Sequence, residues 1–201
     1  MKRNEVSLTI LAAISITTFV LACSQEQQPS QSTNSPTILL GSSQADTVKY
    51  GEYLVTGVGC HDCHSPKVFG PQGPEPDPSR LLAGHIAGTP LPPVDKAALK
   101  SWYLFSQDLT AFSGPWGVSF AANITSDETG IGNWTEEQFF RAMREGKFKG
   151  APEGRQILPP MPWPAFSKLN DTDLKAIFAY LKSTKPIKNV VPPPISPENI
   201  K

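Results

Sequence analysis

The folded part of the chain carries its apolar residues mainly at helical spacing. Near the C-terminus, Leu174 and Leu181 lie two helical turns apart, with further apolar residues at the same spacing between them. Asn170 or Asp171 is a good N-cap for this segment, and Pro186 cannot continue it. The pattern therefore predicts a well-defined closing helix.

Three further helices are expected from the same kind of pattern. One begins near Asp46 and ends around Gly57 or Gly59. Another lies between a capping box that begins at Thr135 and a stop at Gly146. The third is expected over residues 95–109, where one face would carry Ala98, Trp102, Phe105 and Leu109.

Few stretches show the alternating pattern that is typical of strands. Long loops are expected instead, because the chain holds 21 prolines, well above the usual share of about 5%. The prolines cluster in residues 66–78, 90–93, 152–164 and 186–197. The expected fold class is all-α, with a few helices joined by long proline-rich loops.

The N-terminus has the layout of an export signal. Lys2 and Arg3 precede an uncharged run from Val6 to Ala22, which is too short for a comfortable membrane-spanning helix of about 20 residues. The run ends in VLAC, which resembles the lipobox of bacterial lipoproteins, so Cys23 is expected to carry lipid. An uncleaved anchor, or a simple signal with an incidental cysteine, is the alternative.

The chain is expected to divide at residue 22, at residue 45 and after residue 186. Residues 1–22 would be the lipoprotein signal peptide, and residues 23–45, rich in Ser, Gln and Thr, a flexible tether. Residues 46–186 would form the folded domain, with 66–120 as an extended loop or insertion, and residues 187–201 an extended tail. The formal net charge of zero gives no indication of nucleic-acid binding.

The sequence CHDCH at residues 60–64 matches C-x-x-C-H, the attachment pattern of c-type haem. On a helical turn, positions i and i+3 point to one side, so Cys60 and Cys63 can form thioether bonds to one haem. His64 can then bind the iron as an axial ligand. The expected cofactor is one covalently attached haem c, and His61 would be a partly exposed bystander.

Other uses of the two cysteines fit less well. A zinc site needs four ligands, and only His61 and His85 remain to complete one, at the wrong spacing. A thioredoxin-like motif needs a βαβ setting, which the pattern does not suggest. A simple Cys60–Cys63 disulfide stays open.

The second axial ligand is expected to be Met161. It lies in LPPMPWP, where prolines fix the backbone, and a soft thioether is a usual partner of histidine on iron. Met143 is expected to pack in the core, on an apolar helix face. His85 is the rival ligand, although a lone histidine in a glycine-rich loop is more often solvated. An open sixth site would indicate a haem enzyme or a gas-binding protein.

These motifs together resemble class I c-type cytochromes. GEYLVTGVGCHDCH, NITSDETGIGNWTEEQFFRAMREG and MPWPAFSKLNDTDLKAIFAYLKS look like the haem domains of exported bacterial cytochrome c subunits of alcohol and sugar-acid dehydrogenases. Those subunits usually carry three haem motifs, whereas this chain has one, and its segment 66–120 is longer.

The resemblance implies a cytochrome c-like fold around one haem. It implies that the first and last helices cross near Gly51 and Tyr180, and that the segment from Asn123 to Trp134 wraps the propionate side of the haem. Trp134 would contact a propionate or simply pack. The aromatic residues of the insertion would form either a small satellite core or a docking surface; they are Trp102, Tyr103, Phe105, Phe112, Trp116 and Phe120.

The expected function is electron transfer rather than catalysis. A membrane-tethered monohaem cytochrome with His/Met ligation would shuttle electrons between exported redox partners, from a dehydrogenase to an oxidase or another cytochrome. It would lie on the periplasmic side of a bacterial membrane, with the outer membrane favoured by the residue after Cys23.

Overall fold

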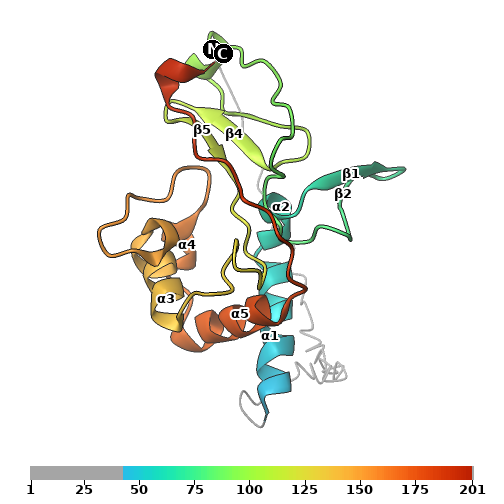
Figure 1. Ribbon diagram of the computed structural model, residues 1–201, viewed down its shortest axis with the longest axis vertical. Coiled ribbons are helices and arrows are strands. Elements are labelled where there is room, and N and C mark those ends of the chain that lie inside the picture. The colour runs from blue at the N-terminus through green and yellow to red at the C-terminus, as the bar shows by residue number, and fades with distance from the viewer. Residues whose placement is uncertain (1–42, 201) are drawn as a thin grey trace, which may run out of the picture. The chain divides into compact units, whose positions relative to one another are not determined.

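A computed structural model describes residues 43–200 (Figure 1). The expectations for the signal peptide, for lipid on Cys23 and for residues 23–42 of the tether lie outside this range. No helix within residues 43–200 has the length and apolar character to cross a membrane. The elements are α1 (Gln44–Gly57), α2 (Cys60–His64), β1 (Lys67–Gly70), β2 (Gly73–Pro76), η1 (Ala98–Lys100), β3 (Leu104–Phe105), β4 (Ala111–Gly114), β5 (Gly117–Phe120), α3 (Glu136–Glu145), η2 (Phe148–Gly150), α4 (Trp163–Phe166), α5 (Asp171–Ser183) and η3 (Pro197–Asn199).

Helices α1 and α5 cross in close contact (Figure 1). A Cβ atom placed on Gly51 would lie 1.9 Å from the backbone oxygen of Ala176 and 2.8 Å from Cβ of Tyr180. Only glycine fits at this point, which confirms the crossing expected near Gly51 and Tyr180. Tyr50 adds a hydrogen bond across the pair, because its hydroxyl donates to Oδ1 of Asp173 over 2.8 Å.

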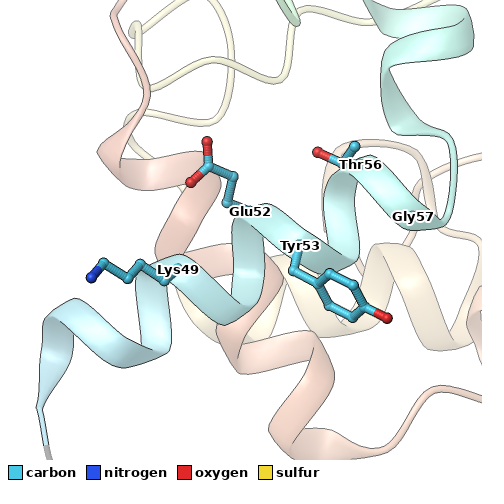
Figure 2. A pocket seen from close by; sticks show the side chains of 5 residues that line it. All are labelled: Lys49, Glu52, Tyr53, Thr56 and Gly57. Carbon is cyan, nitrogen blue, oxygen red and sulfur yellow. The ribbon is translucent and has the colours of Figure 1, made fainter. Parts of the chain in front are cut away.

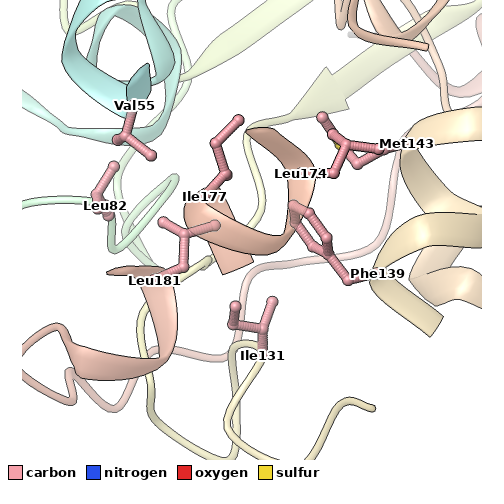
Figure 3. Close-up of a cluster of buried hydrophobic side chains, with 8 residues drawn as sticks. All are labelled: Val55, Leu82, Ile131, Phe139, Met143, Leu174, Ile177 and Leu181. Carbon is pink, nitrogen blue, oxygen red and sulfur yellow. The ribbon is translucent and has the colours of Figure 1, made fainter. Parts of the chain in front are cut away.

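The hydrophobic core surrounds α5. Figure 3 shows its side chains Leu174, Ile177 and Leu181 between residues of α1 and of α3. Burying aliphatic and aromatic side chains of this size stabilises the fold by roughly 1.5–3 kcal/mol each. The whole cluster consists of Val55, Leu82, Ile131, Phe139, Met143, Leu174, Ile177 and Leu181.

The caps of α3 and α5 follow the sequence signals. Thr135 and Gln138 form the expected capping box at the start of α3, and Gly146 ends this helix with a left-handed φ of 67°. Asn170 caps α5 by accepting a hydrogen bond from the backbone N–H of Asp173. Met143 is buried in the core, as expected.

The all-α expectation is wrong, because the chain also forms two small antiparallel sheets. Strands β1 and β2 make a hairpin, and β3, β4 and β5 make a three-stranded sheet in that order. Both sheets lie within residues 66–120. The strands have two to four residues each, which is too short for an alternating pattern to stand out from the surrounding prolines and glycines.

Two of the three hairpins turn at the same short motif. GPQG at residues 70–73 joins β1 to β2, and GPWG at residues 114–117 joins β4 to β5. Proline suits the second position of a type I turn and glycine the fourth. Gly73 and Gly117 both adopt positive φ, at 114° and 98°, which other residues rarely adopt. The repeated motif explains where the strands reverse.

The prediction of a helix over residues 95–109 is also wrong. The chain makes only the single 3-10 turn η1 there and then enters strand β3. Trp102 and Phe105 are 70% and 63% exposed, so the expected helical face buries nothing. Leu109 has a positive φ of 57°, which no α-helix accommodates. Aromatic residues favour strands, and β3 pairs with β4 instead.

The C-terminal tail packs against the insertion. Ile195 forms an antiparallel bridge with Val118 of β5. The buried side chain of Asn189 donates to the carbonyl oxygens of Ala83 and His85 over 2.7 and 2.9 Å. Segments 187–200 and 66–120 therefore support each other, although both consist largely of extended chain.

Candidate functional site

The C-x-x-C-H segment forms a short helix of its own. Helix α1 ends at Gly57, and Gly59, with a left-handed φ of 77°, redirects the chain into α2. Helix α2 spans the five residues Cys60–His64, so its two cysteines lie one turn apart as expected. We call residues 59–67 the attachment turn.

The two thiols of the attachment turn are free and half-buried. Burial raises the pKa of the Cys60 thiol to about 12 and also raises the pKa of Cys63. Both are therefore neutral thiols near pH 7, whereas thiolates are the reactive form in metal binding and disulfide exchange. No group of three or more His, Cys, Asp or Glu residues gathers as a metal site within residues 43–200.

The imidazole of His64 is oriented by a backbone carbonyl. Its Nδ1 lies 2.7 Å from the carbonyl oxygen of Ala122. A carbonyl can only accept, so Nδ1 must carry the proton and Nε2 must present a lone pair. Burial lowers the pKa of His64, which keeps the ring neutral. A hydrogen bond of this kind fixes the orientation of a histidine ring that binds a metal through its other nitrogen.

Neighbouring groups hold the rest of the attachment turn. The fully buried Ser65 accepts a hydrogen bond from the backbone N–H of Leu82 over 2.9 Å. The backbone N–H of Gly84 donates to the carbonyl oxygen of His64 over 2.7 Å. His61, expected to be a bystander, is half-buried and lies 2.8 Å from Oγ of Ser65 through its Nδ1. The turn is thus tied to residues 82–84 of the insertion.

Met161 lies in a loop between α3 and α4, which we call the Met loop and define as residues 157–162. Its side chain is half-buried and packs against the hydrophobic core, as does Cys60. The backbone N–H of Ile157 donates to the carbonyl oxygen of Gly146 over 2.7 Å, and Oγ of Ser119 donates to that of Pro159 over 2.5 Å. The loop is therefore anchored on both α3 and β5.

The segment from Ser119 to Ala122, where the insertion ends, reaches both parts of the site. Ser119 holds the Met loop, and Ala122, three residues later, accepts the hydrogen bond from His64. Neither role can be read from the sequence, because the hydroxyl of Ser119 donates to a backbone carbonyl and Ala122 accepts through its own backbone carbonyl. This segment thus links the two expected axial ligands.

Trp134 packs against the same core cluster as Cys60 and Met161. Within residues 43–200 its indole Nε1 makes no hydrogen bond to the protein, whereas that of Trp116 donates to Ser119. The packing expected for Trp134 is present, and its N–H remains free to donate to an acceptor that is not part of the chain.

His85 is not solvated, contrary to expectation. It is 2% exposed, its Nδ1 lies 2.8 Å from Oγ1 of Thr110, and its ring packs on Phe120 with centroids 4.7 Å apart. The carbonyl oxygen of His85 also accepts from Asn189. These contacts give the residue a packing role between the insertion and the tail.

The aromatic residues of the insertion divide between the two expected environments. Phe112 is buried, while Trp102, Tyr103 and Phe105 are more than 60% exposed. Tyr103 meets the ring of Trp116 edge-on, with centroids 5.0 Å apart. Neither a closed satellite core nor a wholly exposed surface describes the group.

A surface hollow on α1 lies apart from these residues. Figure 2 shows that its lining comes from α1 alone, with the side chains of Lys49, Glu52 and Tyr53 among those that border it. None of the expected haem-binding residues contributes to it. We therefore assign it no part in the site.

Comparison with known proteins confirms the resemblance to dehydrogenase cytochrome subunits. The chain is 28% identical to the fructose dehydrogenase cytochrome subunit of Gluconobacter japonicus over 88% of its length. It is 32% identical to the gluconate 2-dehydrogenase cytochrome c subunit of Pantoea cypripedii over 66% of its length. It is 41% identical over 36% of its length to the cytochrome c subunit of the quinone alcohol dehydrogenase of Gluconobacter oxydans (strain 621H).

The matches cover only part of each relative. The shares of the three relatives are 29%, 22% and 15%, so the chain spans less than a third of each. No family model matches the chain.

These relatives imply haem c as the cofactor, and the residues of the attachment turn fit it. Two free thiols lie one helical turn apart, and the adjacent imidazole has its Nδ1 proton engaged and its Nε2 lone pair available. Cys60, Cys63 and His64 would hold the group, with Met161 and Trp134 against the same core. The chain resembles the haem domains of the cytochrome c subunits of bacterial dehydrogenases.

Proposed function

We propose that this chain is a membrane-tethered electron carrier with one covalently bound haem c. Cys60 and Cys63 would attach the group, and His64 and Met161 would bind its iron. The chain would transfer single electrons and would act on no substrate of its own.

The attachment turn carries this proposal. Its thiols are neutral and unpaired, and the hydrogen bond to Ala122 fixes the His64 ring in the tautomer that a ligand needs. When bound, the haem supplies a reversible one-electron couple of its iron. Cys60, Cys63 and His64 would hold the group, and the hydrogen bond to Ala122 would keep the ring of His64 from rotating.

The Met loop supports a closed sixth position. Met161 is held half-buried beside the core by bonds that end on Gly146 and Pro159. A thioether held in this way costs little conformational entropy on binding iron, since its backbone is already ordered. The N–H of Trp134 would be available to a haem propionate.

The relatives suggest the class of redox partner. They are cytochrome subunits of fructose, gluconate and alcohol dehydrogenases. We propose a dehydrogenase as electron donor and an oxidase or another cytochrome as acceptor. Encounters of this class bury little area and are brief.

The proposed location follows from the N-terminal sequence. The basic start, the short apolar run and the VLAC sequence favour export and lipid attachment at Cys23. The protein would then lie on the periplasmic side of a bacterial membrane, with the outer membrane favoured.

The first test is expression of the full chain with a haem-maturation system. The expected product carries one covalent haem by mass and shows a Met–iron charge-transfer band when oxidised. A product with the mass of the bare chain would refute the proposed cofactor attachment.

The axial ligand is tested by Met161→Ala, with Met143→Leu as the matched control in the core. Met161→Ala should abolish the Met–iron band, lower the reduction potential and admit CO to the reduced protein. Met143→Leu should keep the band. Rapid CO binding to the unmodified protein would instead favour the alternative, a haem enzyme or gas-binding protein with an open sixth site.

A further inference from the structure

Lys67 makes an unusual set of contacts at the end of the attachment turn. It is the first residue of β1 and lies three positions after His64. Its Nζ donates to the carbonyl oxygens of His61 and Asp62, both over 2.9 Å, and to that of Ser65 over 2.5 Å. An ammonium group has three N–H donors, and here each has a backbone acceptor.

The carbonyls of His61 and Asp62 belong to α2, and that of Ser65 belongs to the residue that caps its C-terminal end. The carbonyl oxygen of His61 also accepts from the backbone N–H of Ser65, whereas most of the last carbonyls of a helix lack a donor within it and carry the negative end of its dipole. A five-residue helix cannot rely on its own hydrogen bonds for stability, because nucleation is costly. A cation that binds three of these groups with charge-assisted bonds therefore supplies much of the order in this turn.

The position of the three acceptors brackets the functional residues. His61 and Asp62 precede Cys63 and His64, and Ser65 follows them. We propose that Lys67 is the positioning residue of the attachment turn: its ammonium group fixes the backbone that carries Cys63 and His64, and it keeps a positive charge beside the haem. This inference rests on the proposed attachment of haem at the turn.

The charge has a predictable electronic effect. Oxidised haem iron carries one more positive charge than reduced iron, so a fixed cation nearby disfavours the oxidised form. Lys67 is half-buried, which reduces screening by water and salt. Asp62 and Asp108 act on Lys67 with opposite charge and offset part of the effect. The net contribution should still raise the reduction potential.

The experiment compares three variants of the mature haem protein. Lys67→Met keeps the length of the side chain and removes charge and donors, Lys67→Arg keeps both, and Lys49→Met removes a charge from the exposed face of α1. We expect Lys67→Met to lower the reduction potential and to speed amide hydrogen exchange at residues 63–65. Lys67→Arg should restore most of both properties, and Lys49→Met should change neither.

Two outcomes would overturn the role of Lys67. One is a Lys67→Met protein whose potential and exchange rates equal those of Lys49→Met. The other is a Lys67→Arg protein as impaired as Lys67→Met, because Lys67→Arg retains the positive charge and the N–H donors on which the proposed role depends. If Lys67→Met fails to attach haem while Lys67→Arg succeeds, the yield of covalent haem itself supports the role. Absence of haem from the unmodified chain would refute the proposed function. The haem content of that chain is measured before any variant is compared, so this failure is distinct from a failure of the role of Lys67.

Discussion

The attachment turn and the Met loop hold the two expected axial ligands in different ways. In the attachment turn, Ser65 is fully buried and Lys67 closes the end of α2 with three hydrogen bonds. The Met loop lies nearer the surface, with Pro159, Pro160 and Pro162 all exposed. Its order comes from the stiffness of proline and from a few hydrogen bonds.

This difference implies an order of release. Because several independent contacts hold His64 and few hold Met161, we expect heat, denaturant or added ligands to free Met161 first. The iron would then keep its histidine while exchanging its sixth ligand. Substitutions that weaken one of the two segments and leave the other intact test this order.

Gly51→Ala should have the largest effect. The new Cβ would collide with the backbone of Ala176, and overpacking of this kind costs roughly 1–3 kcal/mol or more. Helix α1 leads directly into the attachment turn, so the strain should reach His64. The release of His64 should then require conditions closer to those that release Met161. The free energy of unfolding in guanidinium measures the loss.

Gly57→Ala is the matched control for this substitution. It lies in the same helix, and a Cβ there meets nothing within 4 Å. This variant should be as stable as the original or slightly more so, because alanine favours helices. Equal stability of the two variants would contradict the close approach of α1 and α5.

Ser119→Ala should weaken the Met loop alone. It removes the hydroxyl that donates to Pro159 and that accepts from the indole of Trp116, at a net cost of about 1 kcal/mol. The Met–iron band should disappear at a lower temperature, and imidazole should displace Met161 at a lower concentration. The contacts of the attachment turn do not involve this hydroxyl.

Ser183→Ala offers a comparison for Ser119→Ala. Its exposed hydroxyl donates to the nearby carbonyl of Tyr180 at the end of α5. The Met–iron band of this variant should respond to heat and imidazole as in the unmodified protein. If Ser119→Ala behaves in the same way, Ser119 does not support the Met loop.

Acid should affect the attachment turn through Asp77. Asp77 accepts hydrogen bonds from Ser79 and Arg80. These bonds, of which that from the Ser79 side chain has the largest effect, lower the pKa of this buried carboxyl to about 2. Asp77 also donates its backbone N–H to the carbonyl oxygen of Pro66 within the turn. Because the folded state lowers the pKa, the carboxylate stabilises the fold fully above its ordinary pKa of 3.8. This contribution is lost as the pH falls toward 2.

Asp77→Asn tests this dependence. The variant should be less stable than the unmodified protein at pH 7, and the difference should shrink as the pH falls below about 4. Unfolding in guanidinium at several pH values gives the measurement, with the exposed Glu75→Gln on the same hairpin for comparison. A stability difference that does not change with pH would show that Asp77 acts through packing rather than charge.

The helices and the attachment motif could be predicted because their signals are local. The apolar spacing and caps of α3 and α5 lie within each segment, and Cys60, Cys63 and His64 are adjacent in sequence. The hairpins were missed because strands of four residues carry little periodicity, although the repeated GPQG and GPWG turns were a usable signal.

The contacts between distant segments could not be read from the residues. Ala122 holds His64 through a backbone carbonyl, which any residue at that position would offer. The burial of His85 depends on Asn189, which lies 104 positions away in the tail. Such pairings depend on how the chain folds back on itself, and a single sequence has no pattern that reports it.

The bridge between Ile195 and Val118 leaves the larger sheet asymmetric. Strands at the border of a sheet present unpaired backbone groups that invite pairing with other chains. The tail covers part of this border on β5, and within residues 43–200 no strand pairs with the outer side of β3. If two copies of this protein ever join by strand addition, the border at Leu104 and Phe105 is the one that is open to them.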